Sequence, residues 1–261
     1  MVLPFSAPKV AVVEMYGAIG RNIRPDSHLP LLERVRRSRH CRALVLTVDS
    51  PGGSAALSEE LYLALRKVAK EKPVVAYVRG MAASGGLYIS AAAHKVVAIR
   101  TALVGSIGVI MARLNVEQLL HRAGVSFTIN KSGAYKDMFS PWRAPSPEEV
   151  QKLQVLTDEV FERFIEVVAE GRHLPIERVR AMATGEIFTA ANAKDLGLVD
   201  ELGDMDRAVE VAAEMAHIKP QVAYLRPARP LLPWTRQGVG QEIASCLVGE
   251  VEALMTGRLH M

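Results

Sequence analysis

Short apolar runs alternate with longer segments of helical periodicity through the first half of the chain. Residues 43–49 are almost continuously apolar, as in a parallel strand buried on both faces, and the breaker Ser50-Pro-Gly-Gly53 follows them. Residues 55–70 then place leucines at helical spacing. Further strands are predicted over 9–15, 73–78, 95–99 and 106–111, and further helices over 29–39 and 84–93. This alternation predicts a layered α/β fold built from βαβ units.

The second half is predicted to be mainly helical. Ser146-Pro-Glu-Glu149 combines an N-cap serine, a proline at the first helical position and a glutamate that can reach back, so a helix is predicted over 146–171. A strand is predicted over 125–129, and shorter helices over 175–182 and 204–216. Residues 220–233, with four prolines, predict a strand and then an extended linker, and residues 241–254 a last amphipathic helix. We expect a main domain over 1–218 and a linker with a helical extension over 219–261.

The composition is that of an ordinary globular protein of 261 residues, 49% apolar and 23% charged, which excludes disorder for most of the chain. Cys41 and Cys246 are the two cysteines, so neither a disulfide framework nor a zinc site is indicated. No apolar run approaches the roughly 20 residues that cross a bilayer. We expect a cytoplasmic protein without a transmembrane segment, cofactor, metal ion or nucleic-acid ligand.

The net charge of +4 comes from the first 40 residues, which hold seven Lys and Arg against three acids. The rest of the chain balances at 25 charges of each sign. The cluster Glu33-Arg-Val-Arg-Arg-Ser-Arg39 is typical of a solvated helix face. The other interpretation is a surface for anions such as lipid headgroups, which would bring peripheral membrane contact.

Ser84 is the first candidate for a nucleophile. It lies in Gly80-Met-Ala-Ala-Ser-Gly-Gly86, after a predicted strand and at the start of a predicted helix, where small neighbours let a substrate backbone approach. The positive end of a helix also favours developing negative charge. The same pattern fits a packing point between helix and sheet. None of the seven histidines lies in a strand-end motif, which lowers the odds of a Ser-His-Asp triad.

A lysine is the other candidate base. Residues 130–140 form a predicted Gly-containing loop that carries Lys131 and Lys136. An ordinary lysine has a pKa of about 10.4, so a lysine base must be desolvated until that pKa falls to about 7–8. The apolar neighbours that would help to line such a pocket are Tyr135, Met138 and Phe139. Taken alone, either lysine also fits an exposed loop.

Gly52 and Gly53 follow the buried strand 43–49. Glycines at this place can point a backbone N–H into the cleft at the carboxyl ends of parallel strands, as an oxyanion hole requires. A simple turn is the alternative interpretation.

Five motifs occur in a fixed order and include all of these residues. They are Asp49-Ser-Pro-Gly-Gly53, Gly80-Met-Ala-Ala-Ser-Gly-Gly-Leu-Tyr88, Gly105-Ser-Ile-Gly-Val109, Lys131-Ser-Gly-Ala-Tyr-Lys-Asp137 and Gly197-Leu-Val-Asp-Glu-Leu-Gly203. Over about residues 9–216 the chain closely resembles the signal peptide peptidase A family of serine peptidases. The resemblance implies a fold similar to Clp protease and crotonase, a spiral of βαβ units that is usually assembled into an oligomer.

The resemblance also implies a Ser/Lys dyad that acts on a peptide substrate. Ser84 matches the family nucleophile, and Lys136 matches the general base because it fills the Tyr-Lys-Asp position. Gly53 matches the oxyanion-hole glycine, and the N–H of Ser84 or of Gly85 is the expected second donor. Ser106 matches a hydroxyl that orients the lysine amine. The implied function is a serine endopeptidase that cleaves signal-peptide remnants or similar apolar segments through an acyl-enzyme.

Three other functions stay open at this point. A crotonase-like acyl-CoA enzyme would share the fold and the paired oxyanion donors. A Clp-like peptidase would use a Ser-His-Asp triad. A non-catalytic oligomeric scaffold would bind peptides or partners without cleaving them.

Overall fold

The computed structural model describes residues 7–227. Within these residues the chain forms two compact units. The first unit holds residues 7–109 and 161–227, and the second unit holds residues 110–160.

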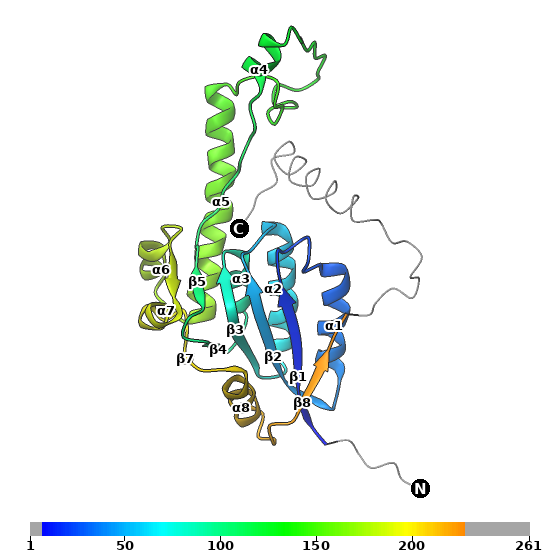
Figure 1. Cartoon of the computed structure of the whole chain (residues 1–261), viewed down its shortest axis with the longest axis vertical. Coiled ribbons are helices and arrows are strands. Elements are labelled where there is room, and N and C mark those ends of the chain that lie inside the picture. The colour runs from blue at the N-terminus through cyan, green and yellow to red at the C-terminus, as the bar shows by residue number, and fades with distance from the viewer. Residues whose placement is uncertain (1–6, 228–261) are drawn as a thin grey trace, which may run out of the picture. The chain divides into compact units, whose positions relative to one another are not determined.

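The first unit is built on an eight-stranded sheet in which every pair is parallel except β5 with β6 (Figure 1). The main path runs β6-β5-β3-β2-β1-β8, and β4 pairs with both β3 and β7. The strands are β1 (Lys9–Tyr16), β2 (Cys41–Ser50), β3 (Val74–Ala83), β4 (Lys95–Ala98), β5 (Leu103–Gly105), β6 (Ile187–Thr189), β7 (Glu201–Leu202) and β8 (Val222–Leu225). This mostly parallel sheet confirms the predicted α/β class and is consistent with a Clp- or crotonase-like fold.

Helices cover both faces of this sheet (Figure 1). One face carries α1 (Pro25–Arg37), α2 (Ala55–Ala69) and α3 (Gly85–Ser90), and the other carries α8 (Met205–Met215). Alternate strand residues such as Val10, Val45 and Val75 pack with α8 in a fully buried cluster, because side chains at every second strand position share a face. The remaining helices are α4 (Glu117–Arg122), α5 (Pro147–Arg172), α6 (Ile176–Met182) and α7 (Ala190–Leu196).

The capping pattern read from the sequence forms as predicted at the start of α5. The Glu149 N–H donates to Ser146 Oγ at 3.2 Å, and the Ser146 N–H donates back to Glu149 Oε2 at 2.9 Å. The helices predicted over 55–70, 175–182 and 204–216 are confirmed to within one residue as α2, α6 and α8. Helix α1 begins at Pro25, before the predicted start at residue 29, since a proline is well suited to the first helical turn.

Two predicted strands are wrong. Residues 106–111 continue no strand, because β5 ends at Gly105 and Ser106 turns the backbone with a φ of 54°. Residues 125–129 also form no strand, and their large side chains Val125, Phe127 and Ile129 are 46%, 54% and 39% exposed. The Phe127 ring stacks on Trp142 with 5.0 Å between the ring centroids. An apolar run forms a strand only where a neighbouring strand takes up its backbone hydrogen bonds.

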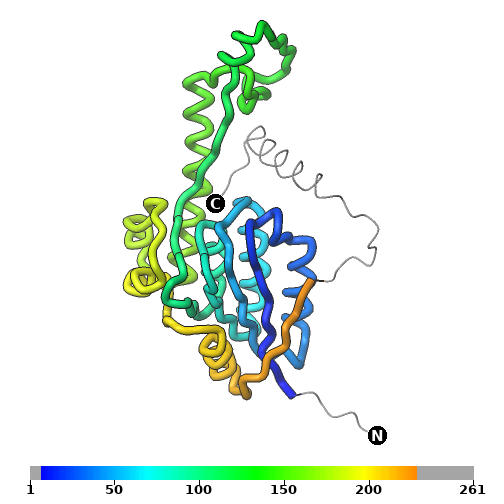
Figure 2. The backbone as a smooth tube through the Cα atoms, viewed as in Figure 1, coloured from blue at the N-terminus to red at the C-terminus, as the bar shows by residue number. Residues whose placement is uncertain are grey.

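The last described segment returns to the first strand (Figure 2). Strand β8, which lies within the predicted 220–233 strand-and-linker segment, pairs in parallel with β1 through Val10 and Val222. The domain boundary at residue 218 stays a prediction, and the helix predicted over 241–254 lies outside the described residues. A search of residues 7–227 finds no helix with the length and apolar character that crossing a membrane requires.

Candidate active site

Three loops meet where neighbouring parallel strands end. Ser50 at the end of β2 is in register with Ala82, and Ala83 at the end of β3 is in register with Gly105 at the end of β5. The carboxyl ends of parallel strands are the usual place for a site in an α/β sheet. The residues that follow these three strands are the predicted oxyanion glycine, nucleophile and orienting serine.

Ser84 occupies a tight turn between β3 and α3. Its φ of 54° and ψ of −122° are rare for a residue with a side chain, and such conformations cost about 1–3 kcal/mol and gather at active sites. The turn is held at both ends, because the Ser84 N–H donates to the Gly105 carbonyl at 2.9 Å and the Ser84 carbonyl accepts from the Tyr88 N–H at 3.0 Å. The Ser84 hydroxyl makes no hydrogen bond within residues 7–227. A fixed backbone with an uncommitted hydroxyl suits a nucleophile.

Ser106 repeats this geometry on the next strand. It follows β5 as Ser84 follows β3, and its φ is also 54°. Its N–H donates to the Glu186 carbonyl at 2.6 Å, and its side chain is partly exposed. The pairing of Ala83 with Gly105 places the two serine turns side by side.

The conformation of the Gly53 loop leaves the Gly53 N–H without a hydrogen-bond acceptor in the described chain. Gly53 forms a bridge with Ile19 in which the Ile19 N–H donates to Gly52 and the Ile19 carbonyl accepts from Ser54. The N–H of Gly53 is not used in this bridge, and it has no partner elsewhere in the described chain. Gly53 has a φ of 149°, and an added Cβ would lie 2.2 Å from the Ile19 carbonyl oxygen. Only glycine therefore fits this position.

Gly85 brings the first turn of α3 against the Gly53 loop. A Cβ on Gly85 would lie 3.3 Å from Gly52 Cα and 2.5 Å from Ser58 Oγ. The first N–H groups of a helix have no partner within that helix, so the Gly85 N–H is free to donate outward. The two expected oxyanion donors thus belong to adjoining loops of one unit.

Helix α3 is anchored by a partly buried polar contact. The Tyr88 hydroxyl donates to Glu59 Oε2 in α2, and the Arg163 guanidinium in α5 lies 3.1 Å from Glu59 Oε1. Tyr88 is 1% exposed, so burial, reinforced by the bond to Glu59, raises the pKa of its hydroxyl well above the ordinary value. No sequence pattern indicates Glu59 or Arg163, which lie 104 residues apart and meet only in the folded chain.

His94 and His28 make their hydrogen bonds away from Ser84. His94 Nδ1 accepts the Val74 N–H at 3.0 Å, at the opposite end of β3 from Ser84. Ten strand residues separate those ends by about 30 Å. His28 Nδ1 lies 2.8 Å from the Arg24 carbonyl oxygen in α1. No hydrogen bond joins a histidine to Ser84 among residues 7–227.

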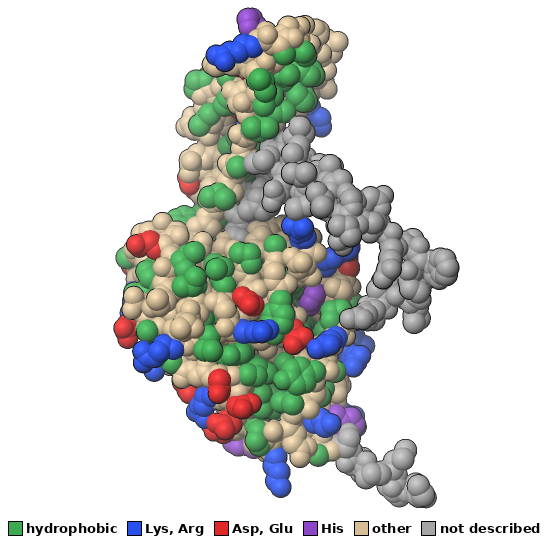
Figure 3. Space-filling model, in the orientation of Figure 1, with side chains coloured by type: hydrophobic (Ala, Val, Ile, Leu, Met, Phe, Trp, Pro, Cys, Tyr) green, Lys and Arg blue, Asp and Glu red, His purple; other side chains and the backbone are tan. Residues whose placement is uncertain are grey.

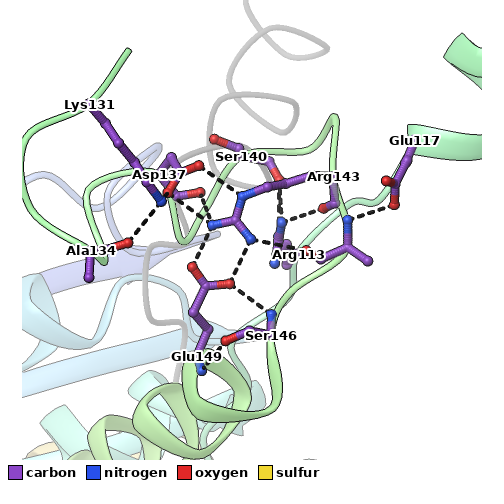
Figure 4. Close-up of polar contacts among 10 residues, drawn as sticks. Arg113, Glu117, Lys131, Ala134, Asp137, Ser140, Arg143, Ser146 and Glu149 are labelled. Atoms are coloured by element: carbon purple, nitrogen blue, oxygen red, sulfur yellow. Dashed lines mark hydrogen bonds and ion pairs between the residues drawn. The ribbon is translucent and has the colours of Figure 1, made fainter. Parts of the chain in front are cut away.

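The lysine loop belongs to the second unit (Figure 4). Arg143 is its centre, with Nε 2.8 Å from Asp137 Oδ2 and Nη1 2.8 Å from Glu149 Oε2. Hydrogen bonds from Arg143 hold the pKa of Glu149 at about 2 and, together with Lys131, hold the pKa of Asp137 well below its ordinary value. This network ties the loop to the first turn of α5.

The two lysines of this loop differ in their contacts. Lys131 Nζ donates to the Ala134 carbonyl at 2.9 Å and forms an ion pair with Asp137 (Figure 4). The Lys131 amine is therefore already engaged by a carbonyl and a carboxylate. The Lys136 amine has no such partner in the described chain, and its side chain is exposed. Of its apolar neighbours, Met138 is buried whereas Tyr135 is 43% exposed.

Comparison with known proteins assigns the chain to a family. A family model described as peptidase family S49 matches residues 66–219, which is more than half of the chain. The chain belongs to peptidase family S49. A provisionally named protease of Synechocystis sp. is 38% identical over 243 residues, which are 92% of this chain and 87% of the relative. A provisionally named signal peptide peptidase of Enterococcus faecium is 37% identical over 186 residues, 71% of this chain and 54% of the relative.

Membership of this family makes the chain a serine peptidase and confirms the predicted resemblance. A solved structure of a mutant of the 1510-N membrane-bound stomatin-specific protease matches with a TM-score of 0.55 over 86% of this chain and 100% of that one. At 16% identity, this match supports the fold alone. In this S49 peptidase, Ser84, Ser106, Gly53 and Gly85 lie together at one sheet edge of the first unit, and Lys136 lies in the second unit.

Proposed function

We propose that this S49 peptidase cleaves peptides with a Ser84/Lys136 dyad. The observation that carries the proposal is the Ser84 turn, whose backbone is fixed by hydrogen bonds while its hydroxyl is uncommitted. The family match makes the protein a serine peptidase, and Ser84 is the serine in the motif that resembles the family nucleophile.

Lys136 is the proposed base because the other lysine of the loop is already paired. Lys131 is bound to Asp137, whereas the Lys136 amine is uncommitted in the described chain. A lysine amine acts as a base only where it is shielded from water, and the Lys136 side chain is exposed in the described chain. Bound substrate, or a neighbouring copy of the chain, would supply that desolvation. Ser106, in its turn beside Ser84, would orient the amine.

The proposed reaction has two steps. Neutral Lys136 takes the Ser84 proton as the oxygen attacks the peptide carbonyl, and the resulting oxyanion accepts hydrogen bonds from Gly53 and Gly85. The C–N bond then breaks, with the proton passing from Lys136 to the leaving amine. A water that gives its proton to the same lysine hydrolyses the acyl-enzyme and regenerates the hydroxyl. No cofactor takes part in these steps.

The substrates we propose are apolar peptide segments such as signal-peptide remnants. The resemblance to signal peptide peptidase A and the similarly named relative support this class. The residues next to Ser84, among them Ala83 and Gly86, are small.

Assembly into a homo-oligomer is the last part of the proposal. The second unit exposes many large apolar side chains, which gather on the face of that unit seen in Figure 3. Ile110 is 70% exposed and Leu119 is 66% exposed. Contiguous exposed apolar side chains mark interaction surfaces in soluble proteins. A neighbouring copy on this surface would also help to desolvate the lysine loop.

The test compares Ser84→Ala, Lys136→Met and Lys131→Met on a fluorogenic peptide with apolar residues before the cleaved bond. We expect the first two variants to lose at least about 1,000-fold in kcat/KM, because each removes a member of the dyad. Lys131→Met, which has the same change of side chain, should keep most of the activity. Wild-type activity in Ser84→Ala or Lys136→Met would refute the dyad.

A second readout separates the remaining functions. A fluorophosphonate probe should label wild type and not Ser84→Ala, whereas a non-catalytic scaffold would not be labelled at all. A Clp-like triad predicts that Lys136→Met labels at the wild-type rate. An acyl-CoA enzyme would bind CoA, and we expect no binding by calorimetry.

A further inference from the structure

Positively charged side chains cluster at the end of the sheet where β2 and β3 begin, opposite the end that carries Ser84. Helix α1 ends at Arg37 before β2, and helix α2 ends at Ala69 before β3, so both loops lie where these strands begin. The C-terminal end of α8 reaches the same edge, since Met215 and His217 line a hollow with Arg42. We call this surface the basic edge; its cations are Arg36, Arg37, Arg39, Arg42, Lys67, Lys70 and Lys72.

The basic edge contains two adjoining hollows of about 540 and 580 Å³. Both are lined by the side chains of Arg36, Arg37 and Glu71, so they adjoin, and together we call them the basin. Seven cations and two carboxylates, Glu33 and Glu71, line the basin. The resulting excess of five positive charges exceeds the net charge of +4 of the whole chain.

The two carboxylates, Glu33 and Glu71, are already paired with arginines, whereas several cations of the basic edge have no partner in the described chain. Arg36 binds both Glu33, at 2.7 Å, and Glu71, while Arg37 also binds Glu33. Lys72 Nζ donates to the Val35 and Ser38 carbonyls at 2.5 and 2.6 Å, which neutralises the negative end of α1. Four exposed cations of the basic edge have neither an ion pair nor a hydrogen bond in the described chain, namely Arg39, Arg42, Lys67 and Lys70.

The side chains that line the two hollows favour an anionic lipid bilayer over a nucleic acid or a small-molecule ligand. A single-stranded nucleic acid needs aromatic side chains on which its bases stack, and neither hollow is lined by one. A small-molecule site is mostly apolar, whereas the apolar side chains of this lining are Pro73, Met215 and Ala216. Unpaired cations from two helix ends and a strand can each attract a separate anionic headgroup of a bilayer.

We infer that the basic edge docks this protein on membranes that contain anionic lipids. The docked face is the edge where β2 and β3 begin, and Ser84 lies at their far end. The ten residues of each strand separate the two edges by about 30 Å, so docking leaves the loops around Ser84 open to solvent. The inference does not depend on the Ser84/Lys136 dyad, because docking requires no turnover.

Vesicle co-sedimentation tests the inference with the full chain. Wild type should sediment with vesicles of phosphatidylcholine mixed with phosphatidylglycerol and stay in solution with phosphatidylcholine alone. Binding should be lost at about 1 M NaCl, where the Debye length falls to about 3 Å. Equal binding to both vesicle types, or none to either, would overturn the inference.

Two matched triple variants locate the surface. Arg39→Gln with Arg42→Gln and Lys70→Gln removes three free cations of the basic edge and should weaken binding on the order of 100-fold. Arg100→Gln with Arg122→Gln and Lys194→Gln removes three exposed cations from elsewhere and should bind as wild type does. Equal loss in both variants would show a general charge effect and reject the basic edge.

Two competitors distinguish the source of the anion. Inorganic phosphate and duplex DNA, each at the salt concentration of the vesicle assay, should fail to displace the protein from anionic vesicles. Displacement by phosphate would indicate a soluble ligand, and tighter binding to DNA would indicate a nucleic-acid partner; either result would refute lipid docking. Fluorophosphonate labelling at the wild-type rate in the basic-edge variant shows that Ser84 is unaffected.

Discussion

Single residues fix the site through their backbone conformations. Ser84 and Ser106 share a φ of 54°, and Gly53 has a φ of 149° that leaves no space for a side chain. Such conformations persist only where neighbours hold them. At Ser84 the neighbours are the Gly105 carbonyl and the Tyr88 N–H, so the Ser84 turn depends on both β5 and α3.

At this scale we predict that Tyr88→Phe impairs both stability and acylation. The change removes the donor to Glu59 Oε2, and a hydrogen bond to a charged group contributes about 1.5–3 kcal/mol. The helix that follows Ser84 also loses its fixed point against α2. Urea denaturation should show the lower free energy of unfolding, and fluorophosphonate labelling should show a slower rate.

Tyr62→Phe is the matched control for this prediction. Tyr62 is 2% exposed and packs edge-on against Tyr88 with 5.4 Å between the centroids, but its hydroxyl makes no hydrogen bond in the described chain. Its loss should change stability by less than about 0.5 kcal/mol. If the two variants behave alike, the contact with Glu59 does not position α3.

At the scale of elements, the packing of α5 against α3 needs a residue without a side chain. An added Cβ on Gly171 would lie 2.0 Å from the Ala91 carbonyl oxygen and 3.0 Å from Ala91 Cβ. The backbone of α5 therefore lies directly against the end of the helix that begins after Ser84.

Gly171→Ala should destabilise the protein although alanine is the better helix former. Helix propensity alone predicts a gain of about 1 kcal/mol, whereas a clash with a buried backbone atom forces helices apart and typically costs about 1–3 kcal/mol or more. Chemical denaturation measures the sign. Gly108→Ala is the control, because its Cβ would meet Gly185 Cα at an ordinary 3.6 Å. A more stable Gly171→Ala protein would contradict this packing.

At the scale of the whole molecule, exposed features are unevenly distributed between the two units. The basic edge belongs to the first unit, while the exposed apolar side chains of Ile110 and Leu119 belong to the second. Charge at one surface and apolar area at another allow a protein to meet two kinds of partner, which we propose are anionic lipid and further copies of the chain.

The proposed assembly predicts that charges on the second unit dissociate it. Ile110→Lys with Leu119→Lys would bury two ammonium groups at the interface between copies, which is costly without a paired anion. Sedimentation velocity should show an oligomer for wild type and smaller species for the variant, with lower peptidase activity. Leu63→Lys, at a 47% exposed position in the first unit, should keep the wild-type mass. A monomeric wild type would refute the assembly.

The sequence by itself determined the local features, because these depend on residues close together in the chain. The alternation of apolar runs predicted the α/β class, and Ser146 with Glu149 predicted the start of α5. The ordered motifs predicted the family that the comparisons confirm, together with candidates for its site. Where a predicted strand had no neighbour to pair with, as at 125–129, local pattern failed.

Only the tertiary structure decided which distant residues meet. Glu59 joins Tyr88 to Arg163, and Arg42 and Lys70 reach the basic edge from different elements. Hydrogen bonds and ion pairs form over about 3 Å, whereas these groups are separated by up to 104 residues of chain. Their meeting depends on sheet order and helix packing, which no local pattern of residues specifies.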